Sequence, residues 1–210
     1  KTNVYEKKKI NFIINENETW LDLGGNIGIF SLLCLSKKAN VITYEPEPEN
    51  FNLLKQNIET NFPESNYKLI QEGVGISTDN VQLYLCKGDY NKYRHTVYKK
   101  RGRESITIKI KSITDILQEH KIDCIKMDIE GAEIDILEFL KPDDYKNAGI
   151  KKMVFEYSFD IDKSIPRFLK IINKLKEYFD VVNYTGVKEN DLEYNYFPCA
   201  KIVYCMQNLV

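Results

Sequence analysis

The chain has 210 residues, with 30 lysines and arginines against 31 aspartates and glutamates, so its formal net charge is −1. Hydrophobic residues make up 43% and charged residues 29%, which is typical of a soluble globular domain with a substantial core. The near-zero charge argues against a protein whose main task is to neutralise nucleic-acid phosphates, and no apolar run approaches the roughly 20 residues that cross a bilayer. We therefore expect no nucleic-acid partner and no membrane insertion.

Strands and helices alternate along the chain. Short apolar runs predict strands, and helix-period segments between them predict helices. We expect strands at 19–23, 41–44, 67–70, 124–127, 152–156, 181–184 and 200–205. Helices are expected at 27–37, 48–57, 112–118, 132–140 and from an N-cap at Ser164 to Phe179, and Pro142 should help to stop the fourth of them. Two stretches in which apolar and polar residues alternate, 81–86 and 105–110, should pair as a hairpin. The order indicates an α/β fold with a doubly wound sheet.

The cysteines and the first residue bear on context. The five cysteines are odd in number and form no C-x-x-C pair, which favours reduced thiols in a cytoplasmic protein over disulfides or zinc; they are Cys34, Cys86, Cys124, Cys199 and Cys205. Because the chain starts at Lys1 rather than methionine, we expect it to be one domain, 1–210, cut from a longer polypeptide. Within it, 1–15 would be a lead-in, and 79–111 an inserted hairpin with an acceptor loop.

The most informative segment is the turn Asp22-Leu23-Gly24-Gly25-Asn26-Ile27-Gly28. It closes a strand and opens a helix, where backbone N–H groups are unpaired and available to a ligand. The dinucleotide pattern G-x-G-x-x-G fails, because Asn26 and Ile29 occupy its second and third glycine positions. Glu45 ends the next strand, where a ribose diol lies in such folds. A ligand with ribose but no pyrophosphate fits both features, although a plain turn and a solvated acid would also explain them.

Three blocks carry a family resemblance: the turn 22–28, Tyr44-Glu45-Pro46-Glu47-Pro48-Glu49-Asn50-Phe51, and Ile125-Lys126-Met127-Asp128-Ile129-Glu130-Gly131-Ala132-Glu133. In their order and spacing the chain resembles the FkbM family of class I S-adenosylmethionine-dependent methyltransferases. The resemblance implies a Rossmann-like seven-stranded sheet with an antiparallel C-terminal strand. One departure is Gly25, where the family usually has alanine, a change expected to leave cofactor binding intact.

The resemblance also implies roles for individual residues. Gly24, Gly25 and Asn26 would line the methionine and ribose part of S-adenosylmethionine, and Glu45 would bind the ribose hydroxyls. Pro46 would flank the adenine, and Asp22 would help to fix the α-amino group. Residues after the third strand, Glu72, Gly73 and Val74, would meet the adenine edge, and Asp128 would also lie beside the cofactor.

Acids end four predicted strands, at Asp22, Glu45, Asp128 and Glu156. In an open α/β sheet the carboxyl ends of the strands face the ligand crevice, so this crevice would be negatively charged and would attract a sulfonium cation. A sugar hydroxyl needs a base, for which Asp128 is the first choice and Glu130, Glu156 and His95 are competitors. Lys126 would share the face of Asp128 and moderate the repulsion.

Other roles for these acids stay open. They could hold Mg²⁺ or Mn²⁺ instead, so a divalent metal remains an alternative. Glu130 is as well explained by the helix dipole as by function. For Glu133 we expect an exposed acid in the first turn of a helix.

The acceptor side is predicted from two loops, 89–98 and 190–197, which mix tyrosines with hydrogen-bonding groups and suit sugar faces. Ordinary solvent loops are the alternative, and the basic run 99–103 is interpreted as a solvated turn. We expect an O-methyltransferase acting on a sugar or glycan, with a glycosyltransferase module as a possible covalent neighbour. The alternatives are a nucleic-acid or protein methyltransferase on the same fold, and a non-catalytic nucleotide- or cofactor-binding module. No Asn/Asp-Pro-Pro-Tyr-like segment supports the first of them.

Overall fold

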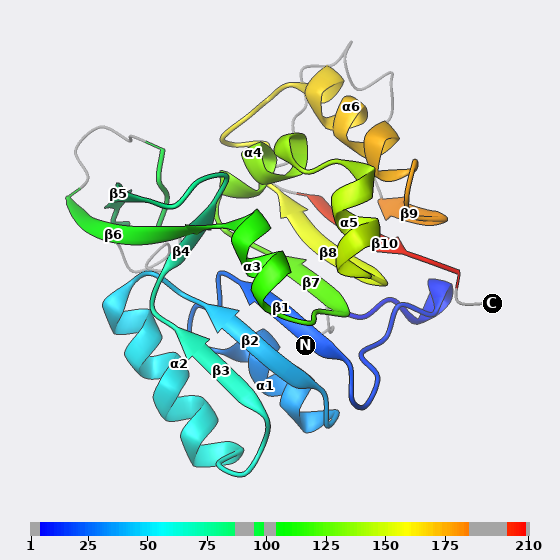
Figure 1. Cartoon of the computed structure of the whole chain (residues 1–210). Coiled ribbons are helices and arrows are strands. Elements are labelled where there is room, and N and C mark those ends of the chain that lie inside the picture. Colours follow the sequence, from blue (N-terminus) through cyan, green and yellow to red (C-terminus); the bar gives the residue numbers. More distant parts are fainter. Residues whose placement is uncertain (1–4, 87–94, 99–103, 185–200, 209–210) are drawn as a thin grey trace.

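The computed structural model describes residues 5–86, 95–98, 104–184 and 201–208. Its main sheet has the order β3-β2-β1-β7-β8-β10-β9, in which β10 runs antiparallel to both of its neighbours (Figure 1). The strands are β1 (Thr19–Leu23), β2 (Asn40–Tyr44), β3 (Tyr67–Ile70), β7 (Cys124–Met127), β8 (Lys152–Tyr157), β9 (Val181–Tyr184) and β10 (Lys201–Met206). The predicted α/β, Rossmann-like, doubly wound seven-stranded sheet with an antiparallel C-terminal strand is confirmed.

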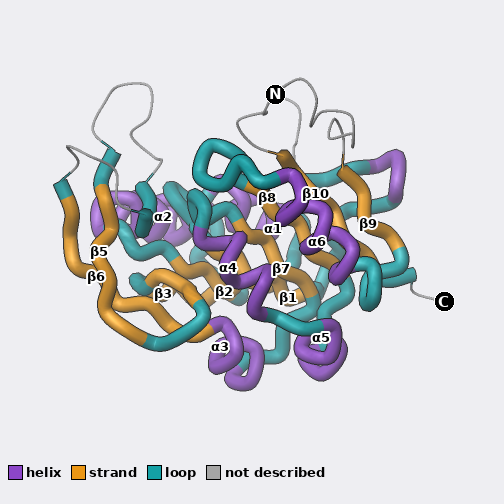
Figure 2. Tube along the Cα trace, turned by 90° about the horizontal axis from the view of Figure 1, so that it is seen from above, coloured by secondary structure: helices purple, strands orange, loops and turns teal. Residues whose placement is uncertain are grey.

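Helices cover both faces of this sheet (Figure 2). One face carries α1 (Ile29–Ser36), α2 (Pro48–Asn61) and the N-terminal segment with the short helix η1 (Lys8–Ile10). The other carries α3 (Ile113–Glu119), α4 (Ala132–Phe139), α5 (Pro142–Ala148) and α6 (Ile165–Leu175). Because the central strands are buried on both sides, they appear in the sequence as continuous apolar runs, which is why they were predictable.

A second, smaller sheet has the order β4-β6-β5 and lies beyond the arrowheads of β1 and β2 in Figure 1. Its strands are β4 (Gly73–Gly75), β5 (Asp79–Tyr84) and β6 (Ser105–Ser112), and β5 pairs with β6 antiparallel. The inserted hairpin is therefore confirmed. Strand β4 was not predicted, because three residues with two glycines carry no strand pattern.

Helix α5 was not predicted. Helix α4 ends at Phe139, one residue before its predicted end, and Pro142 begins α5, whose C-cap residue Gly149 is left-handed with a φ of 70°. Proline suits the first position of a helix, because the N–H that it lacks would have no partner there.

The cysteines are free thiols in the part of the chain that is described. Cys34, Cys124 and Cys205 are buried and Cys86 is half-buried, whereas Cys199 lies outside the described residues. No helix within the described ranges is long and apolar enough to span a membrane.

A buried lysine fixes the strand ends that meet at the centre of the sheet. The Lys126 ammonium, on β7, lies 2.6 Å from the carbonyl oxygen of Gly24 and 3.1 Å from Oδ1 of Asp22 on β1. The other Asp22 oxygen accepts from the Ser31 hydroxyl at 2.7 Å. Burial disfavours the charged ammonium, but the carboxylates of Asp22 and Asp128 outweigh it and raise the pKa of Lys126. The expectation that Lys126 moderates acidic repulsion thus has a structural basis, with Asp22 as its direct partner.

Replacing Lys126 with methionine would leave the Asp22 carboxylate buried without its cation. Removal of one partner of a buried ion pair costs about 3–5 kcal/mol, and we expect K126M to lower the free energy of unfolding in urea by that order. The control is Lys55→Met, which breaks an exposed pair with Glu59 and should cost less than about 1 kcal/mol. Equal losses in the two variants would contradict the assignment.

Gly25 is needed for packing against β2 and α2. A Cβ there would lie 2.3 Å from Cγ2 of Thr43 and 2.9 Å from Cδ1 of Leu54. The backbone of Gly25 is not in the left-handed region, so the restriction is purely steric. The family's usual alanine therefore does not fit beside Thr43 without rearrangement.

We expect Gly25→Ala to destabilise the protein by about 1–3 kcal/mol through overpacking. Thr43→Ser removes the clashing methyl group while keeping the hydroxyl, which lies 2.7 Å from that of Ser31. In the Thr43→Ser background the alanine should cost clearly less, and a double-mutant cycle by urea unfolding measures this coupling. Additive effects would show that Thr43 is not the obstacle.

Candidate functional site

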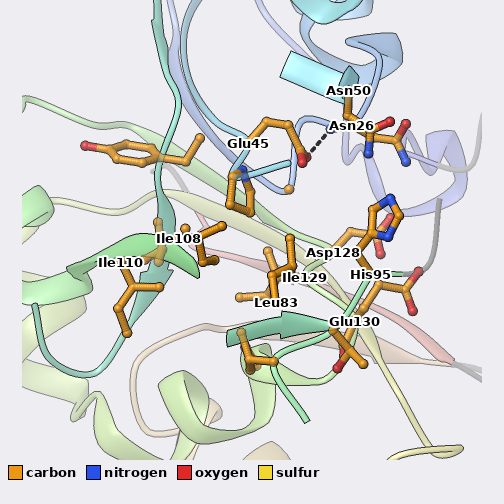
Figure 3. Close-up of a pocket in the computed structure, with 18 residues that line it drawn as sticks. Asn26, Glu45, Asn50, Leu83, His95, Ile108, Ile110, Asp128, Ile129 and Glu130 are labelled. Atoms are coloured by element: carbon orange, nitrogen blue, oxygen red, sulfur yellow. Dashed lines mark hydrogen bonds between the residues drawn. The ribbon is translucent and has the colours of Figure 1, made fainter. Parts of the chain in front are cut away.

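A pocket opens at the carboxyl ends of β1, β2 and β7, with the small sheet as one wall (Figure 3). Together with the open solvent at its mouth, it has about 730 Å³ of space. One side is apolar and consists of Val74, Leu83, Ile108 and Ile110. The other is polar and includes Asn26, Glu45, Asn50, His95, Asp128 and Glu130. The pocket can therefore hold a ligand with one flat apolar end and one polar end.

Glu45 is a buried acid, only 5% exposed, and its carboxylate is held by two hydrogen bonds. Its Oε2 accepts from the backbone N–H of Asn26 at 2.8 Å, and its Oε1 accepts from that of Glu47 at 2.9 Å. Burial raises the pKa of Glu45 to about 7, against these two N–H groups, which favour the ionised form. Its carboxylate is thus aimed at the pocket and titrates near neutrality.

The glycine turn does not present free amides, which corrects the expectation from the sequence. The N–H groups of Gly24 and Gly25 both donate to the carbonyl of Tyr44 at 3.0 Å. The N–H of Asn26 is taken by Glu45, and that of Ile27 by the Asn26 side chain at 2.7 Å. Because these amides already have partners, the turn cannot cradle a phosphate in the way that a dinucleotide loop does. The predicted ligand without pyrophosphate agrees with this arrangement.

The turn after β7 lies directly against the glycine turn. A Cβ on Gly24, whose φ is 80°, would stand 2.0 Å from the carbonyl oxygen of Asp128, so only glycine allows this approach. The Thr96 hydroxyl, from the chain between β5 and β6, donates to the carbonyl of Glu130 at 2.8 Å. Glu130 itself has a φ of 52°, unusual for a residue with a side chain. The segment 128–131 thus joins the small sheet to the main one.

Glu133 was expected to be an exposed acid, and this prediction was wrong. It is fully buried, and its carboxylate accepts from the N–H of Gly131 at 2.8 Å and from that of Ser158 at 3.1 Å. Burial raises the pKa of Glu133 to about 7. It joins the turn after β7 to the turn after β8 from behind the pocket.

Most of the predicted site residues come together. Those that line the pocket are Gly24, Asn26, Glu45, Pro46, Gly73, Val74, His95, Asp128 and Glu130. Four others do not line it: Asp22, Gly25, Glu72 and Glu156. Asp22 faces Lys126, so the predicted negative crevice is partly neutralised; the cofactor contacts proposed for Asp22, Gly25 and Glu72 stay predictions.

His95 is oriented in a way that disfavours its role as a base. Its Nδ1 accepts from the backbone N–H of Cys86 at 3.1 Å. In the neutral ring the hydrogen then sits on Nε2, so His95 acts through a donor rather than an acceptor. Asp128 and Glu130 therefore remain the pocket residues suited to accept a proton.

Sequence reasoning missed several contributors to this region. Asn50 lines the pocket and stands inside the second motif, but no role was predicted for it; Leu83, Ile108 and Ile110 of the small sheet also line the pocket and lie outside all three motifs. Tyr5 packs edge-on against Phe30 at 5.0 Å between ring centroids. Burial raises the pKa of Tyr5, and the carboxylates of Asp128, Asp22 and Glu156 act in the same direction, which places Tyr5 within electrostatic range of the strand ends.

The divalent metal and the acceptor loops are the remaining predictions from the sequence. Within the described ranges, no group of three or more His, Cys, Asp or Glu side chains is arranged to hold a metal ion. Of the predicted acceptor loop 89–98, only 95–98 is described, and the loops 99–103 and 190–197 lie outside the described residues.

Comparisons of sequence place the chain among methyltransferases. The family model described as "Methyltransferase FkbM domain" matches residues 22–182. Methyltransferase sdnD of Sordaria araneosa is 28% identical over 150 residues, which cover 56% of this chain and 58% of that protein. The hexuronic acid methyltransferase AglP of Haloferax volcanii is 28% identical over 129 residues, covering 58% of this chain and 49% of that protein. The chain thus spans about half the length of the curated relatives that it matches.

Solved structures agree in fold. The METTL16 MTase domain superimposes with a TM-score of 0.51 at 12% identity, covering 90% of this chain and 59% of that one. Precorrin-6y C5,15-methyltransferase from Geobacter metallireducens gives 0.50 at 11% identity, with 92% and 82% covered. At such identities the likeness concerns the fold alone. The family match over residues 22–182 goes further, and by it this chain belongs to the FkbM methyltransferase domain family.

Proposed function

We propose that this protein is an S-adenosylmethionine-dependent O-methyltransferase that acts on a hydroxyl group of a sugar or glycan. The observation that carries the proposal is the pairing of a fixed Glu45 carboxylate with a glycine turn whose amides are already bonded. This combination suits a ribose without a pyrophosphate, and it occurs in a chain of the FkbM family.

The pocket residues fit such a cofactor. Glu45 would bind the ribose hydroxyls through the lone pairs that Asn26 and Glu47 leave open. Pro46, Val74 and Ile108 would enclose the adenine, and the polar end with Gly24 and Asp128 would hold the methionine part. When bound, S-adenosylmethionine supplies a methyl group activated by a sulfonium charge.

The acceptor hydroxyl requires a proton acceptor and alignment. Asp128 lines the polar end, and the contacts of its turn with Gly24 and Thr96 hold it in place. Its carboxylate would take the hydroxyl proton while the pocket walls align the acceptor oxygen for in-line attack. Glu130, two residues after Asp128 in the same turn, is the second candidate for this role.

A carbohydrate acceptor is supported by the hexuronic acid methyltransferase among the relatives. Binding should be tested first, by calorimetry with S-adenosylmethionine. Turnover should then be compared on uronic acid glycosides, neutral glycosides, an RNA oligonucleotide and an unstructured peptide, with and without EDTA. We expect transfer to a glycoside; transfer only to RNA or peptide would replace the acceptor class, and absence of binding would refute the proposal.

We expect Asp128→Asn to lower kcat by about 10²–10⁴-fold, the usual contribution of a general base. The affinity for S-adenosylhomocysteine should fall far less than kcat, because the amide keeps the shape of the side chain and can still hydrogen-bond to the methionine part. The matched control is Glu156→Gln, because Glu156 is the second-last residue of β8 and does not line the pocket. Full turnover by Asp128→Asn would assign the proton to another residue.

Cofactor affinity should depend on pH through Glu45. Below its pKa of about 7 the carboxyl is mostly neutral and must lose its proton before it can accept two hydroxyl hydrogens. Affinity for S-adenosylhomocysteine should therefore rise from pH 6 to pH 8 and then level off. The positive charge of Lys126 lowers the pKa of Glu45, and the negative charge of Glu47 raises it. Both charges shift the pH at which the affinity changes, but the affinity still rises with pH.

Calorimetry at pH 6, 7 and 8 measures this dependence. Glu45→Gln should bind more weakly and lose the contribution of Glu45 to the slope. Glu49→Gln, which changes an exposed acid in the first turn of α2, is the control and should keep the slope. An unchanged slope in Glu45→Gln would contradict the assignment.

A further inference from the structure

Asn50 is a largely buried polar residue on the lining of the pocket. It stands in the first turn of α2 and is 5% exposed, and its backbone N–H donates to Oε2 of Glu47 at 2.7 Å. The described residues provide no hydrogen bond to its carboxamide, which lines the pocket. Among the described residues, the solvent-excluded polar atoms without a partner belong to Asp22, His120 and Tyr145, so the carboxamide of Asn50 is open to the pocket. Its oxygen and its NH₂ group are therefore available to a ligand that enters there.

Asn50 is connected to Glu45 by hydrogen bonds through Glu47. Glu47 donates its N–H to Glu45 and caps α2 by accepting from Asn50, so the three residues form one hydrogen-bonded unit. Asn50 and Asn26 both line the pocket, and in Figure 3 their carboxamides are drawn above His95 and to the right of Glu45. Asn26 uses its side-chain oxygen to accept from Ile27, whereas Asn50 keeps both its oxygen and its NH₂ group for the pocket.

The two side chains complement each other chemically. An ionised carboxylate only accepts hydrogen bonds, so Glu45 can bind the hydrogens of a diol but not its oxygens. A carboxamide supplies the missing donors. We infer that Asn50 binds the cofactor together with Glu45, by donating a hydrogen bond to a ribose hydroxyl oxygen. The inference rests on the proposed function and adds a binding residue to it.

The test is calorimetry on the whole chain with two ligands, S-adenosylhomocysteine and its 2′,3′-dideoxy analogue. Asn50→Ala should weaken the first by about tenfold, the value of one hydrogen bond, and the second by less than about twofold. Asn50→Asp removes the donors while keeping the shape, and an acid in the first turn of a helix favours folding. It should show the same dependence on the ribose hydroxyls.

Asn52→Ala is the matched control, because Asn52 is exposed on the same helix and should leave both affinities unchanged. An equal loss for both ligands, or none, in the Asn50 variants would overturn the inference and leave the proposed function standing. If the unsubstituted protein fails to bind S-adenosylhomocysteine, the proposed function falls and the inference falls with it.

Discussion

The site depends on one buried cation. Lys126 donates to the carbonyl of Gly24 and pairs with Asp22, so it ties β7 to the turn that follows β1. A charge in this position is costly to desolvate and is tolerated because β1 and the turn that follows it supply a carboxylate and carbonyl oxygens as partners. With the carbonyl of Gly24 directed to Lys126 and the N–H groups directed to Tyr44, the glycine turn is fully bonded within the protein. The proposed cofactor would therefore form its hydrogen bonds mainly with side chains, and Gly24 would contact it by close packing.

The sheet could be predicted from the sequence because burial on both faces leaves a clear pattern. Strands β3, β7 and β9 begin and end at the predicted residues. Helix ends were less well placed: α2 continues to Asn61, four residues past its prediction, because its apolar face continues to pack through Ile58. Strand β4 has no such pattern and was missed.

The polar contacts of the site were harder to predict. Whether an N–H at the end of a strand meets a ligand or a neighbouring carbonyl depends on tertiary contacts that local sequence does not encode, as Tyr44 demonstrates. The same reason explains the error at Glu133. Helix position suggested exposure, but the N–H of Ser158, 25 residues further along the chain, turns inward to meet its carboxylate. Types of residue were predictable here, and their partners were not.

Two contacts join the described residues on either side of the segment 87–94. The backbone N–H of Cys86 donates to His95, and Tyr84 and Thr96 pair as an isolated β-bridge. These contacts hold the two ends of the intervening segment together. Lengthening a connection that starts and ends at a closed point costs little entropy. A change of length between these two pairs would therefore leave in place the contacts that position Glu45 and the turn of Asp128. The described part of the site is thus insulated from variation in that segment.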